Sequence, residues 1–168
     1  LDGPELSRED AALLEDVVVA TVAPDPRIWP LKIGWIIGAY ADWWAAAAAV
    51  QGMLAECRMG PWACAAACPT VEAFAELRAA QPRDFADRAI AWAQERWAAG
   101  EVLWGFGIAG GKGRQRDERL ALIDAAVARH GRSEAHHYRA SMNAAEAIRQ
   151  RLGRAANMAL GIAAIGLD

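Results

Sequence analysis

Apolar residues recur along most of the chain with the three-to-four-residue spacing of an amphipathic helix. Ser7 and Asp10 have the spacing of a capping box, which predicts the start of a first helix. The apolar stripe that follows consists of Leu13, Leu14, Val17 and Val18. Pro24 and Pro26 end this pattern, because proline lacks the backbone N–H that a helix interior needs.

Proline and small polar residues divide the rest of the chain into further helices. Asp42, Thr70 and Asp84 are candidate N-caps, and Pro69 is expected to close a short helix that begins at Pro61. Helices are predicted over residues 28–40, 43–57, 61–68, 117–130, 133–152 and 157–167, with two more after Thr70 and Asp84.

Residues 101–113 break the helical pattern. This segment is rich in glycine and contains one short extended piece, Val102-Leu103-Trp104. Elsewhere the alternation of apolar and polar residues that is typical of a strand is almost absent. The sequence therefore predicts an all-α fold, whose core forms by packing of helix on helix.

Composition agrees with a globular protein and narrows the choice of partners. Apolar residues make up 55% of the chain and charged residues 23%, which is typical of a folded protein. The net charge of −3 argues against nucleic acid as a partner. No run approaches the roughly 18 apolar residues of a membrane span. The first ten residues are acidic, unlike a secretory signal.

Three cysteines, Cys57, Cys64 and Cys68, are an odd number, which argues against a disulfide framework and favours the reducing cytoplasm. Cys64 and Cys68 lie four residues apart on one helical face, but no histidine lies near them to complete a metal site. We interpret them as small buried hydrophobes and expect no metal.

Tryptophan is unusually frequent. The eight tryptophans are Trp29, Trp35, Trp43, Trp44, Trp62, Trp92, Trp97 and Trp104. Their large apolar area suits core and subunit contacts, and an aromatic-lined pocket is the alternative. Trp43 and Trp44 are adjacent in a helix, so their side chains point about 100° apart. We therefore expect one of them to contact another helix pair or another subunit.

The glycine-rich segment spells G-x-G-x-x-G from Gly105 to Gly110. A dinucleotide fingerprint needs a strand before it and a helix directly after it in an α/β unit, and the surroundings here are helical. Gly111 and Lys112 lack the companions of a phosphate loop. Backbone amides freed by glycine, with Lys112 and Arg114 nearby, could still hold an anion such as phosphate. A solvated basic loop is the alternative interpretation.

The three histidines, His130, His136 and His137, lie late in the chain. His130 falls in the last turn of its helix, where the helix dipole favours a cation. Surface positions are expected for all three, because the sequence identifies no nucleophile or orienting acid beside any of them.

Several landmarks occur in an order that resembles the citrate synthase family. The Ala-rich stretch 42–57 leads into Gly60-Pro61, which is similar to the helix before that family's G-P-x-H-G-G-A segment. Gly105-Phe106-Gly107 resembles the family's G-[FY]-G-H-x-[VL]-Y-K loop, with Lys112 at the lysine.

Two further landmarks follow in the same order. Asp117-Glu118-Arg119 is similar to the family's D-P-R, and Asn157 stands at the asparagine of its P-N-V-D motif. The resemblance spans about residues 25–168 and is loose in residue identity.

Members of that family are all-α homodimers with a large and a small domain, and they join an acyl-CoA to a 2-oxo acid or cleave the product. The resemblance implies a citrate-synthase-like domain of several orthogonally packed helices. Residues 1–60 would form the end of a large-domain-like region, and residues 61–168 a small-domain-like region with the Gly-rich loop 105–113. Coenzyme A or an acyl-CoA is the ligand it implies. The binding residues would be Gly105, Phe106, Gly107, Lys112 and Arg114.

The departures from the family concern its acid–base residues. Ala63 stands at the histidine of G-P-x-H, and Ile108 stands at the histidine of G-[FY]-G-H. Ala159 replaces the aspartate of P-N-V-D, and Ala109 follows the second histidine position. Removing a proton from a thioester α-carbon needs a base and an electrophile, which these side chains lack. Catalytic residues are therefore unknown, and we expect the standard reaction to be lost.

Two functions are favoured by these observations, and an enzyme of new specificity that uses Asp42, His130 or His136 is a third alternative. The first is a repurposed citrate-synthase-like subunit, a pseudoenzyme or altered acyltransferase, that binds an acyl-CoA or another phosphate-bearing ligand and acts with a complementary partner chain. The second is a non-catalytic assembly protein in which tryptophan-rich helices form an oligomer interface. Both place the chain in the cytoplasm, as part of a homo-oligomer or a hetero-oligomer, without nucleic acid or membrane as partner.

Overall fold

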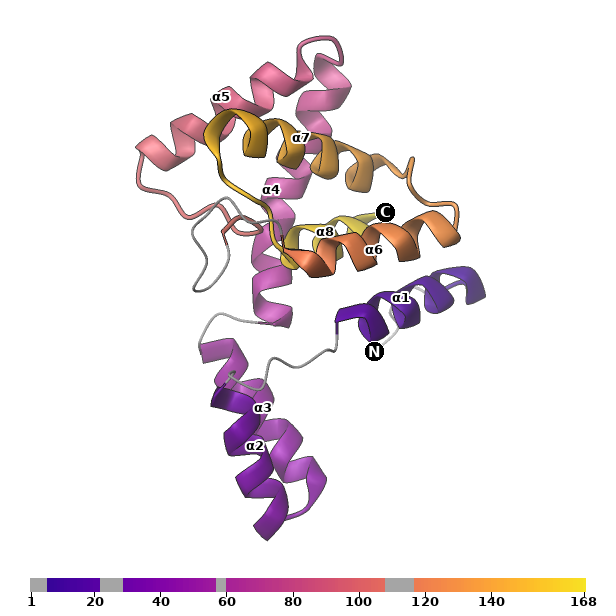
Figure 1. The fold of residues 1–168 in the computed structure, drawn as a ribbon, viewed down its shortest axis with the longest axis vertical. Helices are drawn as coiled ribbons and strands as arrows, with labels where there is room; N and C mark the ends of the chain where they lie inside the picture. Colours follow the sequence, from indigo (N-terminus) through magenta and orange to yellow (C-terminus); the bar gives the residue numbers. More distant parts are fainter. Residues whose placement is uncertain (1–5, 22–28, 57–59, 108–116) are drawn as a thin grey trace.

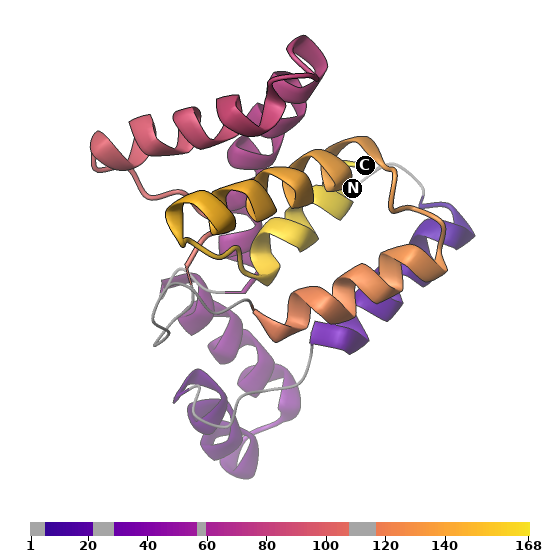
Figure 2. The ribbon, with the colours of Figure 1, turned by 45° about the horizontal axis from the view of Figure 1, so that its top comes forward.

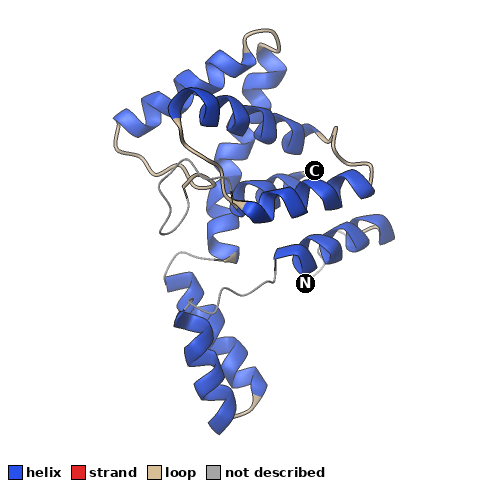
Figure 3. Ribbon diagram, viewed as in Figure 1, coloured by secondary structure: helices blue, strands red, loops and turns tan. Residues whose placement is uncertain are grey.

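The computed structural model describes residues 6–21, 29–56, 60–107 and 117–168, and this part of the chain is built from helices (Figure 3). The helices are α1 (Arg8–Thr21), α2 (Trp29–Tyr40), α3 (Trp43–Glu56), α4 (Pro61–Ala80), α5 (Phe85–Ala98), α6 (Glu118–Arg129), α7 (His136–Leu152) and α8 (Met158–Leu167). The predicted all-α class is confirmed. Within the described ranges, β pairing is limited to one isolated antiparallel bridge between Phe106 and Ala156.

Two of the predicted caps near the N-terminus are confirmed. The Asp10 backbone N–H donates to Ser7 Oγ at 3.0 Å, at the start of α1. The Ala45 N–H donates to Asp42 Oδ1 at 2.8 Å, at the start of α3. Asp84 precedes α5 as expected, but its side chain makes no capping hydrogen bond. These short-range signals therefore locate helix starts well.

The prediction of a helix break at Pro69 is wrong. α4 continues from Pro61 to Ala80 with Pro69 inside it, and Thr70 is buried in the helix instead of capping a new one. Proline removes one i to i−4 backbone hydrogen bond. Val71 and Phe74 directly after it are fully buried, so packing of this segment outweighs the local preference for a break.

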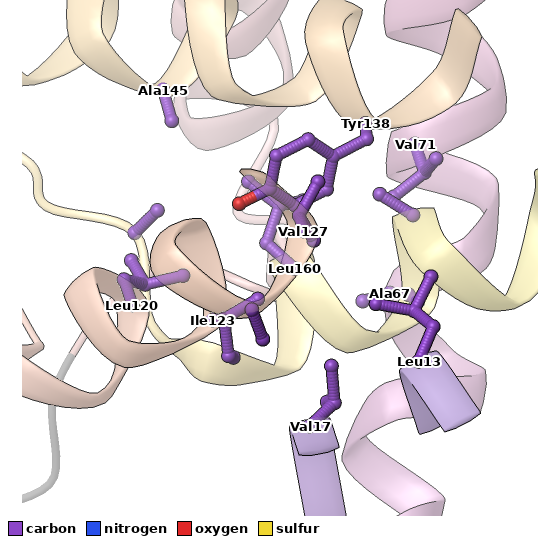
Figure 4. Packing of buried hydrophobic residues seen from close by; sticks show 14 residues of the cluster. Leu13, Val17, Ala67, Val71, Leu120, Ile123, Val127, Tyr138, Ala145 and Leu160 are labelled. Atoms are coloured by element: carbon purple, nitrogen blue, oxygen red, sulfur yellow. The ribbon is translucent and has the colours of Figure 1, made fainter. Parts of the chain in front are cut away.

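Two clusters of buried apolar side chains form the core, and α4 and α7 contribute to both. The first cluster joins α1, α4, α6, α7 and α8, with Ile123 and Leu160 among its fully buried members (Figure 4). The second cluster lies between α4, α5 and α7 and includes Phe74 and Ile148. The long helix α4 therefore packs in both clusters. We call α4–α8 together the body of the protein.

Helix α1 lies alongside α6 in both ribbon views (Figures 1 and 2). Its Leu13 and Val17 are buried in the first cluster. Its carboxylates meet cations at the end of α6, because Asp16 Oδ2 lies 3.1 Å from a guanidinium nitrogen of Arg129 and 2.9 Å from His130 Nε2. Apolar burial and ion pairing thus both attach α1 to the body.

Helices α2 and α3 form an antiparallel hairpin that projects from the body below the start of α4 (Figure 1). Their contact uses small residues. A Cβ added at Gly34 would lie 2.4 Å from Val50 Cγ2, and one added at Gly38 would lie 3.7 Å from Ala46 Cβ. Glycine at position 34 therefore lets the two helices approach closely. No helix in the described ranges is long and apolar enough to cross a membrane.

Candidate functional site and the aromatic hairpin

The described part of the glycine loop, Gly105–Gly107, is held along the segment that leads into α8. The Gly107 N–H donates to the Ala155 carbonyl at 2.9 Å, and the Asn157 N–H donates to the Gly105 carbonyl at 2.8 Å. The Asn157 side-chain amide donates to the Gly107 carbonyl at 2.8 Å. The start of the loop is therefore fixed by both backbone and side-chain hydrogen bonds.

Glycine is required at position 105 for two reasons. Its φ of +95° lies in a region that side-chain-bearing residues rarely adopt. A Cβ built there would lie 2.9 Å from Leu160 Cβ and 3.3 Å from its Cα. Close packing of loop against helix accounts for this glycine without any ligand.

Phe106 points into aromatic side chains of the core. Its ring meets those of Phe74 and Trp97 edge-on, with centroids 6.2 and 5.8 Å apart. This edge-to-face geometry is the usual arrangement of packed aromatic rings. The contacts of Phe106 are those of a packing residue, and the loop start that it anchors belongs to the core.

Two helix starts converge beside this loop and are linked by Asp117. Asp117 Oδ1 accepts from the Arg119 N–H at 3.1 Å and so caps α6, while Oδ2 accepts from the Met158 N–H at 3.0 Å at the start of α8. The Arg119 guanidinium also pairs with both carboxylate oxygens. Asn157 Oδ1 completes the cap of α8 by accepting from the Ala159 N–H at 2.9 Å.

Asp117 is a charged group in a nearly closed environment, since its side chain is only 5% exposed. Burial alone would raise the pKa of this carboxyl, but hydrogen bonds from Arg119 and from the Met158 N–H outweigh burial and hold its pKa below the usual value. In other proteins a helix N-terminus often binds an anionic ligand. Here the carboxylate of Asp117 accepts hydrogen bonds from the first N–H groups of both helices.

Of the five predicted binding residues, the structure describes Gly105, Phe106 and Gly107. Lys112 and Arg114 lie outside the described residues, as do Ile108 and Ala109. Of the other substituted catalytic positions, Ala63 is half-buried in the first turn of α4 and Ala159 is buried in α8. Neither side chain carries a group that could move a proton.

Two cavities lined by described residues stand out, and neither is lined by Gly105, Phe106 or Gly107. One of about 20 Å³ lies between α1, α6, α7 and α8, close to Asp10 and Tyr138. This is room for about one water molecule, whereas small-molecule sites span roughly 300–1,000 Å³. A larger open hollow follows five consecutive residues, 149–153, at the end of α7. Neither is a cleft lined by the predicted binding residues.

The histidines lie at the surface or partly covered, and two of them pair with carboxylates. His130 contacts Asp16, and His137 Nδ1 lies 3.1 Å from Asp168 Oδ1. The largest cause of the lowered pKa of Asp16 is its hydrogen bond with His130, followed by that with Arg129. These pairs connect helix ends to one another, α1 to α6 and α7 to the C-terminus.

The two described cysteines, Cys64 and Cys68, are half-buried and not joined by a disulfide. Burial raises the pKa of the Cys64 thiol, which disfavours the reactive thiolate. The described residues contain no group of three or more His, Cys, Asp or Glu side chains placed to hold a metal ion.

Five of the eight tryptophans fall into two groups. Trp92, Trp97 and Trp104 are partly buried and pack against the core clusters, as the first interpretation expects. Trp43 and Trp44 instead stack on each other, with ring centroids 3.7 Å apart and planes inclined by 29°. Both rings remain exposed, so no helix of the described residues covers either of them.

The most exposed large apolar side chains of the hairpin are Trp35 and Tyr40, which the helical pattern alone does not identify as surface residues. Together with Ile36 they lie on α2 at positions turned away from Gly34 and Gly38, the residues that face α3. The signal is present in the sequence: Ile36 and Tyr40 are four residues apart and share one side of a helix, and Trp35 points about 100° from Ile36.

Comparisons with known proteins do not place the chain in a family: no family model, no curated protein and no solved structure matches it.

Proposed function

We propose that this chain is a non-catalytic helical assembly protein and that the α2–α3 hairpin is the surface through which it binds a partner protein. The observation that carries this proposal is the exposure of large apolar side chains on a projecting element. The exposed fractions are 87% for Trp35, 60% for Ile36, 91% for Tyr40, 63% for Trp43 and 68% for Trp44.

The size of this surface supports an interface. Four of the five side chains are aromatic and carry about 150–250 Å² each, so with these exposed fractions the four rings and Ile36 leave roughly 700–900 Å² open. Soluble monomers rarely expose contiguous apolar patches above a few hundred Å². About 800 Å² on each partner is the usual size of a specific protein–protein interface.

The hairpin is also poor in charge. Between residues 29 and 56 the charged side chains are Lys32, Asp42 and Glu56. A surface with so few charges gives little electrostatic attraction to nucleic acid or to a strongly charged protein. It favours a partner that is recognised by apolar contact and shape, with tryptophan and tyrosine as the anchor residues.

The glycine loop supports the same proposal, because its described residues show no need for a ligand. The described residues of the loop and the starts of α6 and α8 form hydrogen bonds with one another, through Gly105, Asp117 and Asn157. The conformation is explained by packing and capping alone. The citrate synthase resemblance and its acyl-CoA ligand stay predictions, which a calorimetric titration with CoA and acetyl-CoA would test.

The experiment compares the native size of the chain in its own cells with that of a double variant, Trp43→Ser with Trp44→Ser. The wild-type chain should migrate in a complex larger than its 18.0 kDa, and the variant should shift toward 18.0 kDa. Val102→Ser is the matched control, because Val102 is equally exposed but lies outside the hairpin. A complex of unchanged size in the tryptophan variant would count against the proposal.

A further inference from the structure

Helix α1 contributes little to the core cluster that it packs against. Of the fourteen buried residues in the first cluster, α1 supplies only Leu13 and Val17, which lie four positions apart. The rest come from α4, α6, α7, α8 and the segment between α7 and α8. In both ribbon views α1 lies at one side of the body, against α6 (Figures 1 and 2). Most of this cluster is therefore formed without α1.

The surface beneath α1 is largely apolar and incompletely filled. We define the α1 seat as the residues of the body that line the small cavity beside Asp10 and Leu13, namely Val127, Arg132, Ala135, Tyr138, Ile165 and Asp168. The cavity has a volume of about 20 Å³, which is room for about one water molecule. Protein cores contain few voids of that size. The contact between α1 and the seat is therefore looser than a typical core contact.

Three basic side chains lie along the rim of the seat, at the end of α6 and directly after it. Arg129 and His130 both contact Asp16 Oδ2, at 3.1 and 2.9 Å, and Arg132 pairs with Asp10. α1 carries four carboxylates and one arginine, so its net charge is opposite to that of the rim. Ion pairs between partly exposed groups add little stability and are screened by salt. Their main effect is to favour an acidic helix over a basic one.

The carboxylate in the seat does not oppose an acidic helix strongly. Asp168 accepts hydrogen bonds from the N–H groups of His137 and Tyr138, at 2.8 and 2.9 Å, at the start of α7. Its Oδ1 also lies 3.1 Å from His137 Nδ1. The positive end of the α7 dipole and these donors balance its negative charge. The basic rim therefore dominates the charge that faces α1.

We propose that the α1 seat is a helix-binding site, which the chain's own α1 occupies and in which an acidic amphipathic helix of a partner protein can replace it. The site is separate from the α2–α3 hairpin, so the inference goes beyond the proposed function. The helix that fits has the pattern of Asp10, Leu13, Asp16 and Val17: two apolar anchors four residues apart, with a carboxylate three residues before and after the first. Grooves that bind amphipathic helices read anchors at this spacing.

Occupation by the chain's own helix makes the site selective. α1 is joined to the body by the chain, so it competes with a free helix at an effective concentration that is roughly millimolar. A helix that matches the seat no better than α1 is therefore excluded at ordinary concentrations. A helix that fits the seat more tightly displaces α1, which gives the contact an autoinhibitory character.

The test measures binding of a peptide with the sequence of residues 6–21 to full chains in which α1 is disabled. The peptide is blocked at its C-terminus and carries a fluorophore at its N-terminus, so it lacks terminal charges and reports binding by fluorescence anisotropy. The first disabled chain carries Leu13→Ser and Val17→Ser. Its matched control carries Val18→Ser and Val19→Ser, because these two valines are exposed on the same helix.

A second disabled chain keeps both apolar anchors, so it leaves the core composition unchanged. It carries Asp10→Lys and Asp16→Lys, which place two new cations opposite Arg129 and Arg132. Repulsion between these cations should release α1. Circular dichroism establishes that each chain keeps the helices of the body.

We expect the peptide to bind the disabled chains at least about tenfold more tightly than the wild type and the valine control, because the tethered helix no longer competes. A peptide that itself carries Leu13→Ser and Val17→Ser should not bind. Equal affinity for the disabled and wild-type chains, or no binding to either disabled chain, would overturn the inference. Loss of the body's helices in both disabled chains would also overturn it, because α1 would then be an essential part of the core.

A second peptide tests the preference for an acidic helix. It carries Asp10→Asn and Asp16→Asn and should bind the first disabled chain about threefold to tenfold more weakly than the unchanged peptide in 0.1 M salt. The difference should largely disappear in 1 M salt, because the Debye length falls from about 10 to about 3 Å. Equal affinity of the two peptides in 0.1 M salt would overturn the acidic character assigned to the partner helix.

Discussion

At the scale of single residues, Asp117 is the group on which the loop region depends most. Its carboxylate caps α6, reaches the start of α8 and pairs with Arg119. Asp117→Ala should lower the free energy of unfolding by about 2–4 kcal/mol, because it removes a cap and leaves buried donors without an acceptor. Urea unfolding monitored by circular dichroism measures this loss. A change below 0.5 kcal/mol would be at odds with the role given to Asp117.

The same carboxylate gives a pH dependence of defined sign. The pKa of Asp117 is lowered in the folded state, so its contribution is fully present above the unfolded value of about 4 and is lost as the pH falls through the folded value. Asp117→Asn keeps the cap of α6 through its one side-chain oxygen, but it removes the charge and the acceptor of the Met158 N–H. The stability difference between wild type and this variant should therefore be largest near pH 7 and shrink below about pH 4. A difference that grows in acid would contradict this assignment.

Gly105 and Gly107 form a matched pair for testing the packing of the loop. Both have positive φ, +95° and +88°, but only a Cβ at position 105 would collide with Leu160. Gly105→Ala should cost clearly more stability than Gly107→Ala, whose penalty is the backbone strain of about 1–3 kcal/mol alone. Equal thermal shifts for the two variants would show that the contact with Leu160 is unimportant.

Ser141 in α7 is fully buried, and its Oγ has no hydrogen-bond partner among the residues that the structure describes. An unsatisfied buried hydroxyl costs on the order of 1–3 kcal/mol. Ser141→Ala should therefore leave stability unchanged or raise it by about 1 kcal/mol, as measured by denaturant unfolding. A clear loss of stability would mean that the hydroxyl is satisfied in solution.

At the scale of the elements, the sequence predicted helix starts better than helix ends or interruptions. Ser7, Asp42, Asp117 and Asn157 act through neighbours two or three residues away, so their effect is readable from local sequence. The helix break predicted at Pro69 is wrong, because the burial of α4 around it depends on residues far away in the chain. The start of α7 was placed at Ser133 and lies at His136.

The candidate site was predictable only where local conformation decided it. The glycines at 105 and 107 do adopt special backbone conformations, as their residue type suggests. The start of the loop packs through Phe106 and accepts a hydrogen bond from Asn157 at Gly107. These two partners are 50 residues apart in the chain, so no local sequence pattern predicts the contact. The exposure of Trp35 likewise depends on which side of α2 meets α3.

Helix α1 is held to the body by the burial of its apolar side chains. Leu13 is buried between α1 and the body, whereas Leu6 just before the helix is exposed. Leu13→Ala should lower the free energy of unfolding by about 2–4 kcal/mol, since it leaves a cavity in the first cluster, and Leu6→Ala should have little effect. Hydrogen exchange of α1 amides would show local detachment, and equal protection in both variants would contradict the packing described.

At the scale of the whole molecule, the body and the hairpin differ in how they hold their apolar residues. The body buries its large aliphatic and aromatic side chains in two clusters around α4. In the hairpin, Gly34, Gly38 and Ala46 lie at the contact between the two helices, and the rings of Trp35, Tyr40, Trp43 and Trp44 are exposed. This inversion is unfavourable for an isolated chain and is the physical reason for assigning the hairpin to association.

The most direct test places a photo-crosslinking amino acid at position 35 on the outward side of α2, in cells that express the full chain. Position 37, which is half-buried on the same helix, and the exposed position 102 serve as controls. The account predicts a discrete protein adduct from position 35, larger than 18.0 kDa, and none of comparable yield from the controls. The absence of any protein adduct at position 35, or equal adducts at all three positions, would contradict the assignment of the hairpin as the binding surface.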